Sequence, residues 1–370
     1  MSETISRTEK TRVQRHEKSN GGKIAGRVVL VFFTTVIAVV LALVIILATI
    51  IKGPSVQARD TFVTTVLESG NLKFLASIFL SEEQINEIVS KTSMKKMEEE
   101  INKELINTDG ENEVEGNFDE NGIETIEING RSFYATLMIV KDPSKVHVGS
   151  TYPWTEFGKP LDTIVKENKA VAGVNGGLYA SGANKGGTPY GVCVSRGEIQ
   201  YNNPSGWAGL YMIGMDNNNL LRIESIEGWS PKQFEDFVKD EGIRDAVAFQ
   251  DELTDANNHF VPIIINGENR ELNGAGSGAN PRTVIGQRAD GAIMLLVTDG
   301  RGSAGHLGAT ASDLIAIMSE YGAVNAANLD GGSSSCMYYG DEYLMTSVTL
   351  YYANSSWKLP TAFVVDGGVQ

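Results

Sequence analysis

Three short segments of the sequence place polar side chains and glycines directly after an apolar run. They are Asn175-Gly-Gly177, Asp299-Gly-Arg-Gly302 and Asn328-Leu-Asp-Gly-Gly-Ser-Ser-Ser335. Glycine permits positive φ and lets a backbone or a ligand approach closely. Ligand sites in α/β proteins usually lie where strands end. The three segments therefore predict one pocket built at strand ends.

Two arginines near these segments are suited to bind an anion. Arg282 follows a glycine-rich stretch, and Arg301 lies two residues after Asp299. A guanidinium group offers a planar fork of donors that matches phosphate or carboxylate. Each arginine could instead form an internal salt bridge with Asp299 or Asp330. Both aspartates could cap backbone amides, and Asn175 could form an Asx-turn.

The sequence does not favour zinc or serine-nucleophile chemistry. The spacing of its histidines matches no zinc site, because they are scattered: His16, His147, His259 and His306. No nucleophile-elbow pattern accompanies His306. We therefore predict no cofactor, and a divalent ion at Asp299 or Asp330 stays an open alternative without a spacing signature.

The cysteines are too few for a disulfide scaffold. Cys193 and Cys336 each follow a glycine-rich segment. Two buried thiols are the favoured interpretation, and one disulfide between them is the alternative.

The charge of the chain is unevenly distributed. Residues 1–27 carry seven Lys or Arg and three Asp or Glu, a net charge of +4. The whole chain of 370 residues has a net charge of −15, so the remaining residues carry −15 − 4 = −19. Phosphate backbones bind to basic faces. The acidic body therefore argues against a nucleic-acid partner.

An uncharged apolar run covers residues 28–51 and is long enough to cross a bilayer. It exceeds the apolar core of about 7–15 residues in a cleaved signal peptide, which is the alternative. We predict an uncleaved signal anchor. Because the positive charges precede the run, the N-terminal tail 1–27 is expected in the cytoplasm and the body outside the cell membrane.

The rest of the chain divides by its texture. We expect a helical stalk at 52–106, an acidic linker at 107–122 and a catalytic domain at 123–370. In the stalk, Ser81-Glu-Glu-Gln84 is a capping-box pattern, and Lys95 to Ile106 is charged and helix-prone. The apolar stripe of the stalk is interpreted as internal packing.

The catalytic region alternates strand-like runs with few helices. Helices are predicted at 161–168, 230–239 and 310–321, the last two capped by Ser230 and Thr310. Strands are predicted at 123–128, 133–140, 146–148, 170–174, 190–195, 209–215, 244–249, 261–265, 283–287, 292–298, 324–329 and 361–365. This order predicts an α/β (α+β) fold with mixed, largely antiparallel sheets and a few packed helices.

Residues 122–365 resemble the phosphodiester glycosidase family. Four elements carry the resemblance and occur in order: Asn175-Gly-Gly-Leu-Tyr179, Asn280-Pro-Arg-Thr-Val-Ile-Gly286, Asp299-Gly-Arg301 with Gly308-Ala-Thr310, and Asn328-Leu-Asp-Gly-Gly-Ser333. Each element alone would be a weak signal, and the set is specific.

The resemblance implies hydrolysis of a sugar-1-phosphodiester at the glycosidic C1–O bond, with a phosphomonoester leaving. Arg282 and Arg301 would hold the phosphate and stabilise its departing charge. Asp330 or Asp299 would act as nucleophile or activate water. The expected substrate-binding residues are Asn175, Gly176, Gly177, Thr310, Asn328, Gly331, Gly332, Ser333 and Ser334.

Because the anchor places the enzyme at the cell surface, the expected substrate is a cell-envelope glycopolymer or an exopolysaccharide. The chain departs from the family in an insertion, Leu253 to Phe260, which puts the substrate in question. One rival function is cleavage at the P–O bond. The other is non-catalytic glycan binding on aromatic platforms, for which the candidates are Tyr179, Tyr190, Trp207 and Trp229.

Overall fold

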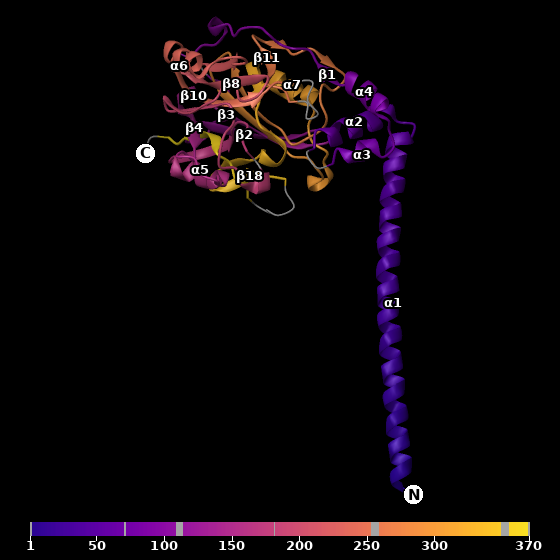
Figure 1. The fold of residues 1–370 in the computed structure, drawn as a ribbon. Coiled ribbons are helices and arrows are strands. Elements are labelled where there is room, and N and C mark those ends of the chain that lie inside the picture. The colour runs from indigo at the N-terminus through magenta and orange to yellow at the C-terminus, as the bar shows by residue number, and fades with distance from the viewer. Residues whose placement is uncertain are drawn as a thin grey trace. The chain divides into compact units, whose positions relative to one another are not determined.

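The computed structural model describes residues 2–69, 72–108, 114–180, 182–252, 259–348 and 355–368, with side chains from residue 22 onward except at 183. The predicted insertion at 253–260 lies mostly outside the described residues. The chain forms two compact units, residues 1–59 and residues 60–370 (Figure 1). The segments predicted as stalk and linker thus belong, from Asp60 onward, to the same compact unit as the catalytic region.

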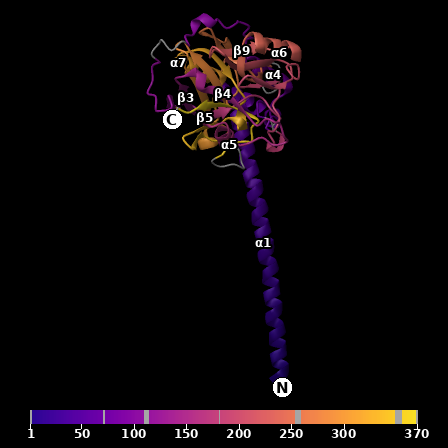
Figure 2. The ribbon, with the colours of Figure 1, turned by 90° about the vertical axis from the view of Figure 1, so that its left-hand side faces the viewer.

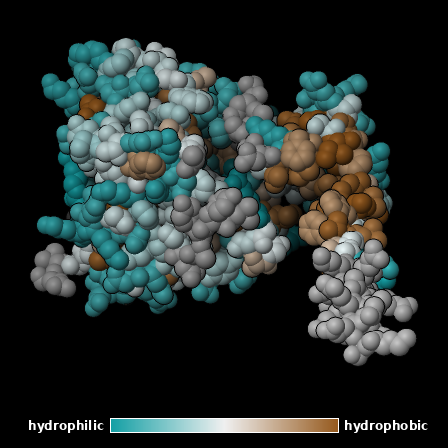
Figure 3. Space-filling model, turned by 60° about the horizontal axis from the view of Figure 1, so that its bottom comes forward, coloured by the Kyte–Doolittle hydropathy of each residue, from teal (hydrophilic) through white to brown (hydrophobic). Residues whose placement is uncertain are grey.

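The first unit is dominated by one helix, α1 (Ser2–Lys52). Its part from Gly22 to Lys52 has a mean hydropathy of 3.2 and is long enough to cross a membrane. Exposed apolar side chains give this stretch its hydrophobic surface (Figure 3). At about 1.5 Å per residue it exceeds the roughly 30 Å hydrocarbon core of a bilayer. The helix fits a single-pass anchor or a signal sequence.

The second unit contains three large sheets, and Figure 2 shows its ribbon turned by 90° from the view of Figure 1. All strand pairs in its described residues are antiparallel. The seven-stranded sheet has the order β12-β11-β16-β14-β15-β3-β2. Its strands are β2 (Ile123–Asn129), β3 (Tyr134–Val140), β11 (Pro262–Ile265), β12 (Glu268–Asn269), β14 (Thr283–Arg288), β15 (Ile293–Thr298) and β16 (Ala323–Asn328). The predicted fold class is confirmed.

The other two large sheets have five strands each. The order β7-β6-β10-β8-β9 joins β6 (Val192–Ser195), β7 (Glu198–Asn202), β8 (Leu210–Asp216), β9 (Leu221–Ser225) and β10 (Ile243–Gln250). The order β18-β17-β5-β19-β4 joins β4 (Val146–Ser150), β5 (Ala170–Asn175), β17 (Met337–Tyr339), β18 (Glu342–Met345) and β19 (Thr361–Asp366). The predicted strands are therefore present in the structure.

One central core lies between the three sheets. Side chains from each sheet meet there, including Met138, Ile213 and Phe363. The opposite face of each sheet packs against a helix: α7 (Ala311–Glu320) on the seven-stranded sheet, α6 (Pro231–Asp240) on the sheet of β10, and α5 (Leu161–Glu167) on the sheet of β5. This burial on two faces explains why β15 is an uninterrupted apolar run.

Local sequence signals fix where the helices begin. Ser230 and Thr310 accept hydrogen bonds from the third helical residue of α6 and α7, and both helices have complete capping boxes. Ser81 caps α4 (Glu82–Ser90) in the same way. These N-caps were predicted and are confirmed. Cys193 and Cys336 are free and buried, as favoured from the sequence.

The stalk region is a small helical cluster with its own core. Side chains of α2 (Val56–Leu67), α3 (Phe74–Ser77) and α4 pack together around Val63, Val66 and Ile88. The apolar stripe is thus internal packing, as interpreted. A two-residue strand, β1 (Ser93–Met94), then pairs with β13 (Leu272–Asn273).

The predicted helix at Lys95 to Ile106 is wrong. The segment has one short 3-10 turn (Lys103–Leu105) and is otherwise irregular. Its backbone is bonded to distant groups, with the Lys95 N–H donating to the Glu271 carbonyl and the Asn102 N–H to the Asn266 side chain. Met97 is buried in the central core. These tertiary contacts override the helix propensity of its charged residues.

Candidate active site

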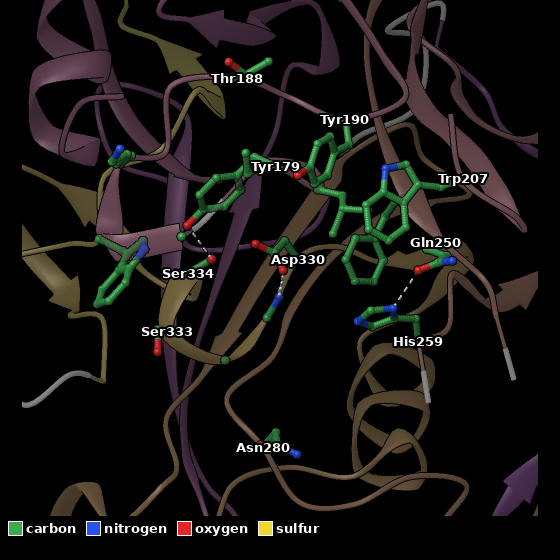
Figure 4. A pocket seen from close by; sticks show the side chains of 18 of the residues that line it. Tyr179, Thr188, Tyr190, Trp207, Gln250, His259, Asn280, Asp330, Ser333 and Ser334 are labelled. Carbon is green, nitrogen blue, oxygen red and sulfur yellow. Dashed lines mark hydrogen bonds between the residues drawn. The ribbon is translucent and has the colours of Figure 1, made fainter. Parts of the chain in front are cut away.

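A cavity of about 1340 Å³ opens where strands of all three sheets end. Its wall includes residues that follow β5, β10, β15 and β16, and residues that precede β14. Figure 4 shows the side chains of many of the residues that line it. The members used below are Glu68, Tyr179, Tyr190, Trp207, Gln250, His259, Asn280, Arg282, Arg301, Asp330, Gly331, Gly332, Ser333 and Ser334. The predicted pocket at strand ends therefore exists.

Asp330 belongs to this wall and lies two residues after β16. One carboxylate oxygen accepts a hydrogen bond from the Gly331 N–H at 2.9 Å. Protein atoms surround the carboxyl group, although part of the residue is exposed to the cavity. Burial raises the pKa of Asp330 to about 6, against opposing contributions from Ser334, His259 and Arg301. A carboxyl group that lines a cavity and has a pKa close to neutral pH is suited to catalysis.

Asn175 fixes the backbone that carries Asp330. Its side-chain amide donates to the Asp330 carbonyl at 2.7 Å, and its oxygen accepts from the Thr283 hydroxyl at 2.7 Å and the Cys336 N–H at 3.2 Å. Asn175 is completely buried and does not line the cavity. These are long-range bonds and not the Asx-turn that was the alternative. They join β5, β14 and the loop after β16.

Two predicted glycines allow close packing, and one of them also lines the cavity. A Cβ atom at Gly177 would lie 2.3 Å from the Ala248 carbonyl oxygen. Gly332 does line the cavity, with φ of 63°, and a Cβ there would lie 2.6 Å from the Arg301 guanidinium. Gly332 therefore makes room for Arg301.

Arg282 is paired with Glu68, a residue that was not predicted to belong to the site. One of its terminal nitrogens donates to the Glu68 carboxylate at 2.5 Å. The Glu68 carboxylate also accepts from the Gly278 N–H at 2.5 Å and the Asn280 amide at 3.1 Å. The side chains of Glu68 and Arg282 are only 4% and 9% exposed. Arg282 thus has an ion pair, but not with Asp299 or Asp330.

Arg301 reaches the same cavity from the loop after β15. Its Nε donates to the Asn280 side chain at 3.3 Å and one terminal nitrogen to the Ser333 hydroxyl at 3.1 Å. The residue is exposed overall, but protein atoms crowd its guanidinium. This desolvation, and next the positive charge of Arg282, lower the pKa of Arg301. Two guanidinium groups are therefore held near each other.

Asp299 does not line the cavity. One of its oxygens accepts from the Tyr134 N–H at 2.7 Å, and the other lies 2.7 Å from Nδ1 of His306. The structural alternative, a carboxylate that caps backbone, describes this geometry. We therefore leave Asp299 out of the catalytic set that we propose below.

The remaining predicted residues divide between the cavity and its support. Thr310 caps α7, and the Asn328 amide donates to the Phe260 carbonyl at 3.0 Å. Gly331, Ser333 and Ser334 line the cavity. Predicted residues outside its wall are Asn175, Gly176, Gly177, Asp299, Thr310 and Asn328.

Aromatic side chains form another part of the wall. The rings of Tyr190 and Trp207 lie 5.0 Å apart, and Trp207 is 46% exposed. The Tyr179 hydroxyl is 2.9 Å from the Ser334 hydroxyl. Trp229 packs against Phe237 beside α6 and is not in the cavity wall.

Glu68, Gln250 and Asn280 were not among the predicted site residues, and no role was predicted for His259. Glu68 lies far along the chain from the glycine-rich segments, and only the tertiary fold brings it there. Asn280 was part of a quoted motif and could have been found from it. Among the described residues, no group of three or more His, Cys, Asp or Glu side chains is placed to hold a metal ion.

The model of the phosphodiester glycosidase family matches residues 168–366. The chain therefore belongs to this family, which consists of hydrolases that act on phosphodiester glycosides. The matched range includes Arg282, Arg301 and Asp330, whereas Glu68 precedes it.

The fold is similar to that of a solved family member. The catalytic domain of zebrafish N-acetylglucosamine-1-phosphodiester alpha-N-acetylglucosaminidase, auto-inhibited by its pro-peptide, aligns with a TM-score of 0.50 and 16% identity. The alignment covers 66% of this chain and 82% of that one. A hypothetical protein from Synechocystis aligns with a TM-score of 0.40 and 18% identity, covering 66% and 62%.

A curated relative matches only a short region. The SPbeta prophage-derived uncharacterized protein YomE of Bacillus subtilis is 45% identical over 56 residues. These residues are 15% of this chain and 8% of that protein.

The raised pKa of Asp330 predicts a pH-dependent change in stability. Below about pH 3.9 the carboxyl group is protonated in both folded and unfolded states, and its burial has little cost. At low pH the raised pKa therefore stabilises the folded protein. As the pH rises through about 6, the folded protein must hold a buried charge, and this contribution to the free energy of unfolding is lost. We expect the free energy of unfolding of Asp330→Asn to increase relative to that of the wild type between pH 4 and pH 7.

The gain should be at most about 3 kcal/mol, because the cavity is open to solvent. Urea unfolding across this pH range measures it. Asp236→Asn, a change on the exposed face of α6, is the matched control and should follow the wild type. Parallel curves for Asp330→Asn and the wild type would show that the Asp330 carboxyl has no raised pKa.

Proposed function

We propose that this chain is a membrane-anchored extracytoplasmic hydrolase that cleaves the glycosidic C1–O bond of a sugar-1-phosphodiester in a cell-envelope glycopolymer or exopolysaccharide. The observation that carries the proposal is the placement of Arg282, Arg301 and Asp330 in one cavity. Two guanidinium groups suit a phosphate, and a buried carboxyl group suits the anomeric carbon beside it.

The cavity suggests how the substrate lies. Asn280, which bonds with Glu68 and Arg301, is on one side of Asp330 in Figure 4, and Tyr190 and Trp207 are on the other. We place the phosphate at the arginines and the sugar ring toward the aromatic pair, whose faces suit the apolar face of a pyranose. The C1–O bond would then lie near Asp330.

The proposed reaction follows from this placement. The C1–O bond breaks with its electron pair going to the phosphate oxygen, and Arg282 and Arg301 stabilise the departing charge. Asp330, as a carboxylate, stabilises the positive charge that develops at C1 or bonds to it. The phosphate is already a good leaving group, so protonation of its oxygen contributes less than in ordinary glycosidases.

The first unit supports the cellular placement. The apolar stretch Gly22–Lys52 is preceded by basic residues, which favour a cytoplasmic N-terminus. The body would then face the polymers of the cell envelope.

A glycan-binding protein is the second candidate, and the exposed Trp207 beside Tyr190 favours it. Such a platform binds a sugar without chemistry. A buried carboxyl group with a raised pKa and two neighbouring guanidinium groups cost stability, however, and pure binding does not need them.

Sugar release tests the proposed reaction. We expect the full-length chain in detergent to release N-acetylglucosamine from UDP-N-acetylglucosamine or from N-acetylglucosamine-1-phospho-methylmannoside. Asp330→Asn and Arg282→Lys should each lower kcat/KM by roughly 100-fold or more, because each loses a transition-state contact worth about 2.7–4 kcal/mol. Asp236→Asn is the control. Equal release by wild type and Asp330→Asn would exclude Asp330 from the chemistry.

The carboxylate of Glu68 occupies the place that this proposal gives to the phosphate. It takes hydrogen bonds from Arg282, Asn280 and the Gly278 N–H, and like a phosphodiester it carries a single negative charge. The zebrafish relative is auto-inhibited by its pro-peptide. We propose that Glu68 acts similarly here and must leave before a phosphodiester binds.

Glu68→Gln tests this competition. The change keeps the shape but removes the charge that pairs with Arg282, a charge-assisted contact worth about 1.5–3 kcal/mol. We expect KM to fall roughly 10- to 100-fold. Without an anion, the variant should unfold at a lower temperature, because Arg282 is left buried and unpaired, and inorganic phosphate should restore the loss.

Glu87→Gln, an exposed change on α4, is the matched control. A rise in KM or a loss of kcat in Glu68→Gln would mean that Glu68 helps to position Arg282 for catalysis and does not compete with substrate.

A further inference from the structure

Hydrolysis of a glycosidic bond requires a base whichever stereochemical course it takes. When water attacks C1, its oxygen forms a bond to carbon and it must give up a proton. The leaving phosphate is bound at the arginines in the proposal above, on the far side of the broken bond. The proton must therefore go to a group of the cavity near C1.

Asp330 is poorly placed to serve as both the partner of C1 and the base. One of its oxygens accepts from the Gly331 N–H, and Ser334 also bonds to its carboxyl group. These donors stabilise the charged form and fix its orientation. Such a carboxylate is suited to face the developing charge at C1.

His259 lines the same cavity and is held in a defined tautomer. Its Nδ1 lies 2.9 Å from the Oε1 of Gln250. The Gln250 amide nitrogen donates to the Ala208 carbonyl at 2.9 Å, so its oxygen must be the atom that faces His259. An amide oxygen only accepts, and therefore Nδ1 carries the proton. In neutral His259 the basic lone pair is then on Nε2.

The surroundings of His259 hold the ring still. Its ring packs edge-to-face on Phe249 with centroids 5.4 Å apart, and its carbonyl accepts from the Glu252 N–H at 3.1 Å. Gln250 is only 5% exposed and ends β10. The base would thus be positioned by a sheet and not by a surface loop alone.

His259 and Asp330 are close enough to interact. A positive charge on His259 stabilises the Asp330 carboxylate. In Figure 4 the ring nitrogen not bonded to Gln250 lies on the side toward Asp330. In the part of the chain that the structure describes, the other charged side chains of this cavity are Glu68, Glu156, Lys185, Arg282 and Arg301. Glu252 pairs with His259 through the backbone.

We propose that His259 is the base of the reaction, that its Nε2 takes the proton of the attacking water, and that Gln250 is the positioning residue that keeps Nε2 basic. The proposal rests on the hydrolysis proposed above. In that step the bond from water oxygen to C1 forms, and the C1–O bond to phosphate or to Asp330 breaks. The electron pair goes to the departing oxygen and the proton goes to Nε2.

The test compares full-length wild type, His259→Ala, Gln250→Leu and the control His147→Gln, whose histidine is outside the cavity. His259→Ala should lower kcat roughly 10²- to 10⁴-fold with little change in KM, and added imidazole should restore part of it. Gln250→Leu should lower kcat by a smaller factor, because the tautomer is no longer fixed. Circular dichroism and thermal unfolding check that each variant folds.

The pH profile gives a second readout that a structural role would not change. In wild type both Asp330 and His259 must lose protons, so log(kcat/KM) should approach a slope of two at low pH. In His259→Ala the slope should fall to one. An unchanged slope, or a loss confined to KM, would overturn the proposal.

A third readout separates this proposal from the proposed function. If wild type releases no sugar, exchange of the imidazole C2 hydrogen, followed by mass spectrometry, still reports on each histidine. Gln250→Leu should change the exchange rate of His259, because it removes the hydrogen bond to Nδ1, and leave that of His147 in place. No change at His259 would mean that Gln250 does not hold the ring, and the pairing proposed here would be wrong.

Discussion

Two guanidinium groups share one partly buried cavity, and the rest of the site depends on how their charge is balanced. Arg282 and Arg301 lie near enough for Arg282 to lower the pKa of Arg301. Burying like charges together is unfavourable unless an anion is present. In this structure the Glu68 carboxylate is that anion, and in the proposed reaction the phosphodiester replaces it. The two guanidinium groups therefore make the cavity a binding site for an anion.

The position of Asp330 depends on hydrogen bonds from an uncharged residue, Asn175. Asn175 is buried and bonds to Thr283, to the Cys336 N–H and to the Asp330 carbonyl. It thereby fixes the loop after β16 against β5 and β14, strands of two different sheets. A residue that we expected to bind substrate thus acts on the geometry of Asp330. The identity of its partners explains why an asparagine is needed there, because it must donate and accept at once.

Much of the fold could be predicted from the sequence, because local sequence patterns determine where its strands and helices lie. The strands were predicted from apolar runs, and α4, α6 and α7 from their N-cap residues. The same reasoning failed at Lys95 to Ile106, where helix propensity gives way to bonds with Asn266 and Glu271. No periodicity within a segment reports a partner that is far away in the chain.

The site was predictable to a similar extent. Glycine-rich strand ends pointed to Arg282, Arg301 and Asp330, which do line one cavity. They pointed equally to Asp299, whose carboxylate is bonded to Tyr134 and His306 elsewhere. Glu68 and the pair of Gln250 and His259 could not be predicted, because their role arises from tertiary contacts and not from spacing.

The central claim is that the bond between C1 and oxygen is the one that breaks. Hydrolysis in water labelled with oxygen-18 tests it most directly. Mass spectrometry of both products from full-length wild type would locate the label. We predict the label on the released sugar at C1 and none on the phosphomonoester. Label on the phosphate would contradict the account, because water would then have attacked phosphorus, and Asp330 and His259 would need other roles.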